Sequence, residues 1–355
     1  MPNHRIAVIA GDGIGPEVLG AAIRVLDSAL AKTEEGSVTW HSFDWGSSHY
    51  LEHGTMMPAD AIDQLRPYDA IYLGAVGHPK VQDHVTLNGL LLPIRRQFDQ
   101  YVNLRPSYLY EGVSSPLANK RPGSIDLVVF RENTEGEYAN VGGRLYQHTS
   151  HEVAIQSSIF TRHGTERIIR AAFEHARKRR RHVTSITKSN AQGHSMVFWD
   201  EVFAEVARDF PEIQTWSLLV DAAMEMVRRP EIFDVIVASN LFGDILTDLA
   251  AIVCGSIGLA ASANLNPDKK HPSMFEPVHG SAPDIAGKGI ANPLASVIAG
   301  ILMFEHLGLA QTGRRLDLAV RALLRNQKAL PADLGGKATT AETCEALVAM
   351  LDSVP

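Results

Sequence analysis

The chain has 355 residues, of which 45% are hydrophobic, and its formal net charge at pH 7 is −7. A chain of this length buries one large core or two modest ones, and we expect two lobes. The acidic balance argues against general nucleic-acid binding, which requires a cationic surface that releases counterions from phosphates. The basic run at 177–181 is interpreted as the cationic C-terminal turn of a helix that begins near Gly164.

Cysteine usage and hydropathy indicate a cellular compartment. The two cysteines, Cys254 and Cys344, imply neither a disulfide framework nor a thiolate metal site, so we expect a reducing compartment. No apolar stretch reaches the ~18 residues of a membrane span, and the N-terminal apolar run is too short and too strand-like for a signal peptide. The expected location is the cytoplasm.

The first predicted elements are a buried strand over residues 6–10 and a helix to about residue 32, with Pro16 in its first turn. The turn between them, "AGDGIGPEV", is glycine-rich but lacks the spacing of a dinucleotide-binding turn. Gly11 and Gly13 would require a small third residue at position 16, where the chain has proline. We therefore expect this turn to line a cleft while any nucleotide is held elsewhere.

Strands and amphipathic helices alternate along the rest of the chain. Strands are predicted at 68–76, 125–130, 182–187 and 233–239, which is an α/β pattern. Several short extended segments between 101 and 160 indicate additional antiparallel ribbons. Thr339 and Glu342 predict a capping box at the start of a last helix.

The sequence "SNLFGDILTDL" carries the sharpest local chemistry. Asp244 and Asp248 are four residues apart, a spacing that stacks both carboxylates on one face of a helix. Two like charges repel unless a cation lies between them, and a hard divalent ion suits carboxylate ligands. Asp221 follows an apolar strand-like run and is a third candidate ligand, with a helix cap as the alternative.

Three arginines at the edges of predicted elements, Arg95, Arg105 and Arg131, suit an acidic metabolite, because guanidinium groups bind carboxylates in bidentate fashion. Surface salt bridges are the alternative. Tyr138 and Lys188 are candidates for proton transfer if they lie buried near a cation, and a packed phenol and a solvated lysine are their alternatives.

Taken together, these motifs resemble the metal-dependent, decarboxylating dehydrogenases of 2-hydroxy acids, the family of isocitrate and 3-isopropylmalate dehydrogenases. The resemblance extends over nearly the whole chain. It rests on "AGDGIGPEV", "LGAVG" at 73–77, "NLRP" at 103–106, "REN" at 131–133, "TKSN", "SNLFGDILTDL" and "FEPVHGSAPDIAGKGIANP" at 275–293.

The resemblance implies an α/β, two-lobed isopropylmalate-dehydrogenase-like fold, with mixed sheets flanked by helices and a discontinuous first domain. Residues 1–100 plus 256–355 are expected to bind the cofactor. Residues 101–255 are expected to hold substrate and metal and to form the dimer. The implied assembly is a homodimer with shared active sites, without nucleic-acid or membrane partners.

The implied cofactors are NAD and Mg²⁺ or Mn²⁺, with K⁺ as an additional ion. The resemblance places the adenosine half of NAD on the late glycine-rich loop, where Asp284 accepts both ribose hydroxyls and repels a 2′-phosphate. The cofactor-binding residues it implies are Glu276, His279, Gly280, Ser281, Ala282, Asp284 and Asn292.

The resemblance also implies roles in catalysis. Asp244 and Asp248 of one subunit are the expected metal ligands together with Asp221 of the other, and Lys188 is the expected base, also from the other subunit. Arg95, Arg105 and Arg131 are expected to bind the β-carboxylate of the substrate. Tyr138 is expected to protonate the product carbon.

The substrate is inferred from the segment "VTLNGLLLPIRRQFDQYVNLRP". Isocitrate is disfavoured, because its third carboxylate would meet only apolar groups around residues 90–93. Leu91 and Leu92 match isopropylmalate enzymes, but Asn88 stands where these usually have an acidic residue. Other phrases resemble the D-malate and tartrate dehydrogenase branch, so we expect oxidative decarboxylation of D-malate to pyruvate, with tartrate as a second substrate. The alternatives are a 3-isopropylmalate dehydrogenase and a non-catalytic nucleotide-binding regulator.

Overall fold

The structure is a computed structural model that describes residues 2–354. Five strands lie side by side in the order β2 (Ser37–Ser42), β1 (Asn3–Gly11), β3 (Ala70–Ala75), β12 (Ser273–Pro277) and β11 (Ala261–Leu265). All of these neighbours are parallel except β11, which runs antiparallel to β12. The strands belong to the first of two compact units, which comprises Met1–Gln100, Pro106–Ile125 and Ala251–Pro355. Residues 6–10, predicted as a buried strand, form the core of β1.

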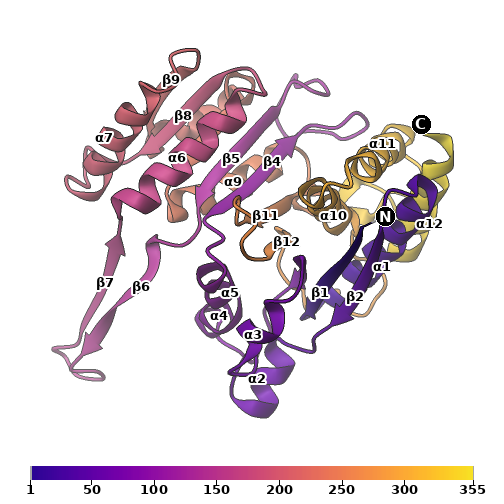
Figure 1. Ribbon diagram of the computed structural model, residues 1–355, viewed down its shortest axis with the longest axis horizontal. Coiled ribbons are helices and arrows are strands. Elements are labelled where there is room, and N and C mark those ends of the chain that lie inside the picture. Colours follow the sequence, from indigo (N-terminus) through magenta and orange to yellow (C-terminus); the bar gives the residue numbers. More distant parts are fainter. Residues whose placement is uncertain (1, 355) are drawn as a thin grey trace. The chain divides into compact units, whose positions relative to one another are not determined.

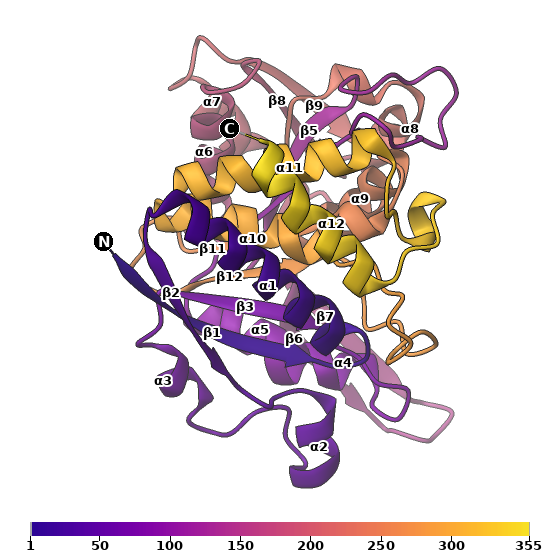
Figure 2. The same cartoon turned by 90° about the vertical axis from the view of Figure 1, so that its right-hand side faces the viewer.

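Helices cover both faces of this half-sheet. On one face α1 (Gly15–Thr33), α10 (Leu294–Leu307), α11 (Ala310–Asn326) and α12 (Thr340–Ser353) pack together, and Figure 2 shows α2 (Ser47–His53) and α3 (Ala61–Leu65) on the opposite side of β1 and β3. The predicted capping box of the last helix is confirmed, because Thr339 and Glu342 each accept the other's backbone N–H.

Three further short helical elements of this unit follow β3 in the chain. They are α4 (Asp83–Thr86), a π-helical turn η1 (Leu87–Leu91) and α5 (Leu92–Gln97). Leu90, Ile94 and Phe98 are fully buried there in one apolar cluster with residues of β1 and β3. Short 3₁₀ turns, η4 (Ile257–Leu259) and η5 (Ala332–Leu334), complete the unit.

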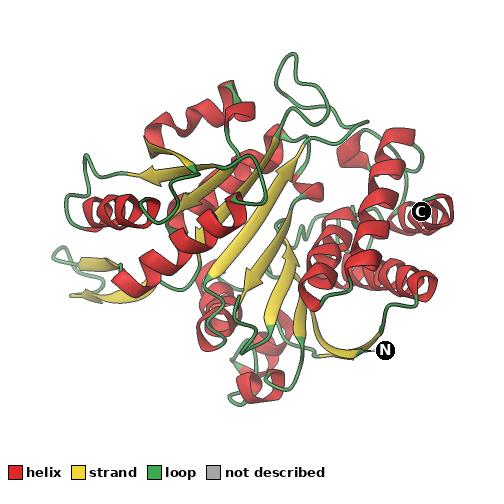
Figure 3. Ribbon diagram, turned by 45° about the horizontal axis from the view of Figure 1, so that its top comes forward, coloured by secondary structure: helices red, strands yellow, loops and turns green. Residues whose placement is uncertain are grey.

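The second unit comprises Tyr101–Arg105 and Asp126–Ala250. Its strands run parallel in the order β5 (Asp126–Glu132), β10 (Val235–Ala238), β8 (His182–Thr187) and β9 (Gln214–Leu219). Helix α6 (Arg162–Ala176) packs on β5, β10 and β8, and α7 (Ser195–Ala207) packs on β8 and α6. Figure 3 shows this alternation of strands and helices. Strand β4 (Val102–Tyr108) crosses the boundary between the two segments of chain.

An antiparallel ribbon, predicted between residues 101 and 160, is present as β6 (Gly136–Leu145) and β7 (Val153–Ile159). Figure 1 shows it extending from the rest of the second unit. Three short elements, η2 (Val220–Met224), α8 (Glu225–Arg228) and η3 (Pro230–Ile232), follow β9.

The basic run at 177–181 directly follows α6 and is paired with acidic side chains. Arg177 contacts Glu174 and Glu212, and Arg179 contacts Asp126 and the buried Asp234. Helix α6 begins at Arg162, two residues before the predicted start, and its cap is Thr161. No helix within residues 2–354 is long and apolar enough to cross a membrane.

Candidate functional site

Helix α9 (Asn240–Val253) brings two carboxylates into a cluster of charged side chains in the second unit. The Asp244 carboxylate forms an ion pair with Arg131, and its other oxygen accepts the Tyr138 hydroxyl at 2.8 Å. Arg105 Nη1 lies 3.4 Å from Asp244 Oδ1 and 3.7 Å from Asp248 Oδ1. Five side chains singled out from the sequence therefore meet here, although they come from β4, β5, β6 and α9.

The two arginines are held in place by neutral groups of α9. Arg131 is 3% exposed, and its Nε and Nη2 donate to Asn240 Oδ1 at 3.0 and 2.8 Å. Arg105 donates to Thr247 Oγ1 at 2.6 Å. A side chain on Gly243 would meet the Arg131 side chain at 2.6 Å, so only glycine permits this close approach.

The start of α9 is fixed by a residue of β6 that sequence reasoning missed. The Glu137 carboxylate accepts Ser239 Oγ at 2.9 Å and the Leu241 backbone N–H at 3.1 Å. An acceptor at a helix N-terminus satisfies a backbone donor that the helix itself leaves unpaired. The only feature of the sequence that points to Glu137 is its place directly before Tyr138 in "EGEY".

Partial burial and the neighbouring Asp244 charge raise the pKa of the Asp248 carboxyl, against the opposing effect of Arg105. Arg105 Nη1, which lies near both carboxylates, compensates their repulsion only in part, so the pKa of Asp248 stays above its ordinary value. The oxygen ligands suit a hard divalent ion, and two carboxylates supply only part of the coordination sphere of such an ion.

Lys188 and Asp221 form a second cluster. Lys188 follows β8, Asp221 lies in the turn η2 after β9, and parallel pairing of β8 with β9 places both at the carboxyl ends of neighbouring strands. Their side chains form an ion pair, in which the hydrogen bond from Lys188 lowers the pKa of the Asp221 carboxyl. Asp221 does not cap the turn, which was its alternative interpretation. Within residues 2–354 no three His, Cys, Asp or Glu side chains are grouped to hold a metal ion.

Arg95 lies in the first unit, in a buried pair with Glu276. Arg95 Nη2 donates to Glu276 Oε1 at 2.8 Å, and Asn264 Nδ2 donates to the same oxygen at 2.8 Å. Arg95, predicted to bind the substrate carboxylate, thus contacts Glu276, predicted to bind the cofactor. Leu92, at the start of α5, is 3% exposed, while Leu91 packs partly buried on the same apolar cluster. The roles of these residues toward substrate and cofactor stay predictions.

The other predicted cofactor residues lie on the segment from Pro277 to Leu294. Gly280 and Ser281 line a cavity of about 520 Å³ together with Pro283 and residues 76–79 and 81–83. Asp284 is exposed, Ala282 has a φ of 38°, and burial lowers the pKa of His279. Asn292 donates to Asp333 at 2.9 Å, an acidic residue that sequence reasoning did not single out.

The glycine-rich turn after β1 packs against this segment. The Ile14 N–H donates to the Ser281 carbonyl at 2.8 Å, and a side chain on Gly13 would meet that carbonyl at 2.0 Å. The buried Asp12 carboxylate accepts Ser47 N–H at 2.9 Å, Ser47 Oγ at 2.6 Å and Gly77 N–H at 2.8 Å. Asp12 thus ties together backbone segments beside the cavity.

Arginines and a tyrosine, residue types that can bind anions and transfer protons, meet around α9, and the cavity in the first unit is bordered by glycine-rich backbone. Such a combination is typical of α/β enzymes that act on acidic small molecules. The sequence matches the isocitrate/isopropylmalate dehydrogenase family over residues 5–349, and the chain belongs to this family.

Individual relatives agree with this assignment. The chain is 54% identical over 315 residues to a tartrate dehydrogenase/decarboxylase of Pseudomonas putida, covering 87% of this chain and 86% of that protein. It is 50% identical to a D-malate dehydrogenase (decarboxylating) of Escherichia coli K12, covering 98% of each. The crystal structure of isocitrate dehydrogenase from Methylococcus capsulatus superposes with a TM-score of 0.88 at 36% identity, covering 98% and 99% of the two chains.

The family resemblance and the α/β fold expected from the sequence are therefore confirmed. The chain is an oxidoreductase of the decarboxylating-dehydrogenase type.

We predict that Asp12→Asn raises the KM for the nicotinamide cofactor by about tenfold, because the amide presents a donor to a backbone N–H that needs an acceptor, at a cost of ~1–3 kcal/mol. The KM for the hydroxy acid should change much less. The matched control is Glu35→Gln, since the Glu35 carboxylate also accepts backbone N–H groups, at Gln311 and Thr312, but these do not line the cavity, whereas Gly77, a partner of Asp12, does. Equal effects of the two substitutions on the cofactor KM would contradict a positioning role for Asp12.

Proposed function

We propose that the chain is an NAD- and divalent-metal-dependent dehydrogenase that converts D-malate to pyruvate and CO₂ and also accepts tartrate. The observation that carries this proposal is the cluster around Asp244, in which two buried arginines and a tyrosine hydroxyl meet a carboxylate. The names of the two relatives, which refer to tartrate and D-malate, support the choice of substrate.

Arg105 and Arg131 bind the carboxylate of the substrate that is lost as CO₂. Guanidinium groups match planar carboxylates, and both side chains are already oriented by Thr247 and Asn240. Their ion pairs with the aspartates keep the two charges neutralised before substrate enters. Uncompensated buried charge is thereby avoided in the free enzyme.

The metal is held by Asp244 and Asp248 of one subunit and Asp221 of the partner subunit. The donor set fits Mg²⁺ or Mn²⁺, because it consists of carboxylate oxygens and because Asp248 already lies under the influence of the Asp244 charge. A bound divalent cation polarises the C2 hydroxyl and the carbonyl oxygen that replaces it.

Lys188, as the neutral amine, would accept the proton of the C2 hydroxyl, directly or through water, and NAD would supply the hydride acceptor. The contact between Lys188 and Asp221 positions the side-chain nitrogen beside the metal ligand of its own subunit. Tyr138 then supplies a proton to the carbon that has lost CO₂, and its hydroxyl is oriented by Asp244 Oδ2 at 2.8 Å. The Arg131 guanidinium also lies 5.3 Å from the centre of the Tyr138 ring, within the distance of a cation–π interaction.

A homodimer completes each site. The ribbon β6–β7 exposes Val141, Leu145, Tyr146, Val153 and Ile155, and a two-stranded ribbon has little stability by itself in water. Met224, three residues after Asp221, is 67% exposed, and Ile245, directly after Asp244, is 57% exposed. Apolar surface beside both halves of the site supports its burial against a second copy.

The proposed reaction is tested by measuring NADH formation with D-malate, tartrate, 3-isopropylmalate and isocitrate, each with Mn²⁺. D-malate should give the highest kcat/KM, tartrate should be turned over, and excess EDTA should abolish activity that Mn²⁺ or Mg²⁺ restores. The highest kcat/KM with 3-isopropylmalate would replace the proposed substrate. Full activity in EDTA would eliminate the metal, and no turnover of any acid would favour a non-catalytic binding protein.

NAD should be preferred over NADP by more than about tenfold in kcat/KM, because Asp284 presents an exposed carboxylate to the place of the 2′-phosphate. Asp284→Lys should remove most of that preference. Glu111→Lys makes the same charge change at an exposed position outside the loop and should leave the preference intact. If Asp284→Lys does not alter the NAD-to-NADP ratio, the ribose is bound elsewhere.

Lys188→Met and Asp244→Asn should each lower kcat by about 10²–10⁴. Mixing the two variants should restore activity, because a heterodimer then contains one intact site. With complete subunit exchange the mixture should reach roughly a quarter of wild-type activity, since half of the dimers carry one intact site of two.

The ion pair between Lys188 and Asp221 supplies a matched control for this mixture. These two residues belong to the same half of the site, so a mixture of Lys188→Met with Asp221→Asn leaves both sites of the heterodimer defective and should stay inactive. Recovery in the control, or none in the first mixture despite demonstrated subunit exchange, would rule out a site shared in this way.

A further inference from the structure

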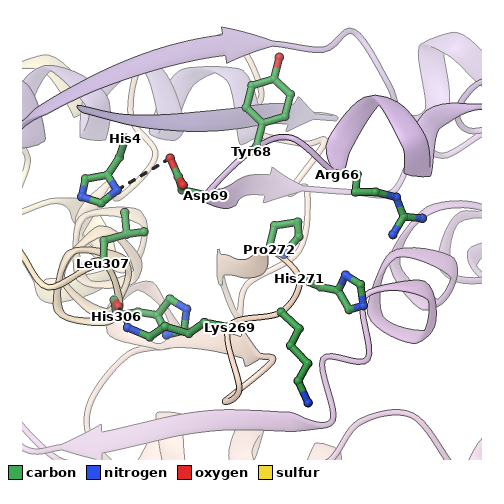
Figure 4. A pocket seen from close by; sticks show the side chains of 10 residues that line it. His4, Arg66, Tyr68, Asp69, Lys269, His271, Pro272, His306 and Leu307 are labelled. Carbon is green, nitrogen blue, oxygen red and sulfur yellow. Dashed lines mark hydrogen bonds and ion pairs between the residues drawn. The ribbon is translucent and has the colours of Figure 1, made fainter. Parts of the chain in front are cut away.

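A pocket of about 270 Å³ lies in the first unit at the amino-terminal ends of β1, β3 and β12 (Figure 4). The loops before β3 and β12, the beginning of β1 and the end of α10 form its walls. Its lining contains an unusual number of basic side chains: His4, Arg66, Lys269, Lys270, His271 and His306. Asp69 is its one carboxylate.

This pocket is separate from the cavity beside Gly280. The glycine-rich turn after β1 and the segment after β12 follow the carboxyl ends of the strands, whereas the basic pocket lies at their amino ends. Strand β3, with six residues, spans about 20 Å between the two edges of the sheet. Ligands of open α/β sheets ordinarily bind at the carboxyl edge, so the basic pocket is not accounted for by the dehydrogenase reaction.

Among the described residues that line the pocket, no carboxylate forms an ion pair with a lysine or an arginine. Asp69 is already occupied, because its Oδ2 accepts the Arg5 backbone N–H at 2.8 Å and lies 3.8 Å from His4 Nδ1. Lys269 Nζ donates to the His306 carbonyl at 2.6 Å and forms no ion pair with any carboxylate of the described chain. An ammonium group has two further protons to donate.

The remaining two cations have acidic neighbours outside the pocket lining. Arg66 lies 3.4 Å from Asp63, and Lys270 lies 2.9 Å from Asp268. All four of these side chains are at least half exposed, and exposed ion pairs contribute little free energy. Both cations can therefore be redirected toward a ligand at small cost.

The imidazoles add donors that do not depend on permanent charge. Burial and the Lys269 charge lower the pKa of His306 to about 4, so this ring is neutral at pH 7 and retains one N–H. His4 Nε2 is buried and has no hydrogen-bond partner within residues 2–354. A buried polar nitrogen without a partner is costly, and a ligand oxygen would satisfy it once the ring turns toward the pocket.

We propose that this pocket binds a small phosphate-bearing anion. Ammonium and imidazole donors approach from β1, from the 269–271 loop and from α10, and such divergent single donors suit the tetrahedral oxygens of phosphate. The planar arginine pair around Asp244 instead suits a carboxylate. A volume of 270 Å³ exceeds the needs of inorganic phosphate and leaves room for a small organic group beside Tyr68.

Isothermal titration calorimetry with inorganic phosphate, at an ionic strength held constant with potassium chloride, tests this proposal. The wild-type protein should show saturable binding, and Lys269→Gln and His271→Asn should each weaken it, the former by about tenfold or more. The matched control Lys328→Gln removes the same charge from an exposed position outside the pocket and should not change the affinity.

Two further arms identify where the phosphate binds and its chemical source. Arg131→Met removes an anion-binding group from the proposed substrate site and should leave phosphate binding unchanged, so failure of the proposed function does not affect this test. Tighter binding of glycerol 3-phosphate than of inorganic phosphate, lost in Lys269→Gln, would assign an organic phosphate, and the reverse order would assign the free ion. No saturable binding of either at millimolar concentration, or binding lost in Arg131→Met but kept in Lys269→Gln, would overturn the proposal.

Discussion

The buried positive charge of Arg131 is the constraint on which the arrangement around α9 depends. A guanidinium that is 3% exposed must be neutralised and must fill its hydrogen bonds within the protein. Asp244 supplies the charge and Asn240 the acceptor, and both belong to α9. The helix must therefore run close to β5, which explains the glycine at position 243 and the fixing of the helix start by Glu137.

The ion pairs of the cluster also bear on the proposed reaction. In the chain as described, arginines and aspartates neutralise one another, so neither set of charges is left unpaired in a partly buried site. In the proposed reaction, an acidic substrate and a divalent cation would each take over one half of these pairs. Binding would then exchange ionic partners instead of creating buried charge, which would keep its desolvation cost low.

Local sequence signals predicted the elements well but long-range pairs poorly. The spacing of Asp244 and Asp248, the capping box at Thr339 and the buried strand after Arg5 depend on neighbours within a few residues, and all three elements are present. Arg95 and Glu276 are 181 positions apart, and nothing in either segment indicates that they meet. Asp12 was passed over for a similar reason, since its partners, Ser47 and Gly77, lie on other turns.

Within one chain, Lys188, the proposed proton acceptor, and the α9 carboxylates belong to different clusters. Lys188 and Asp221 follow adjacent strands, β8 and β9, and hold each other, whereas Asp244 and Asp248 are held by arginines from β4 and β5. Neither half contains both a base and a pair of carboxylates on one helix face. Met224 lies beside the Lys188–Asp221 pair and Ile245 beside Asp244, and both apolar side chains are exposed. Contact with a second subunit that buries these side chains would therefore also bring the two clusters together. In the proposed homodimer, burial of apolar area and completion of the site would be one event, and the isolated subunit would be inactive.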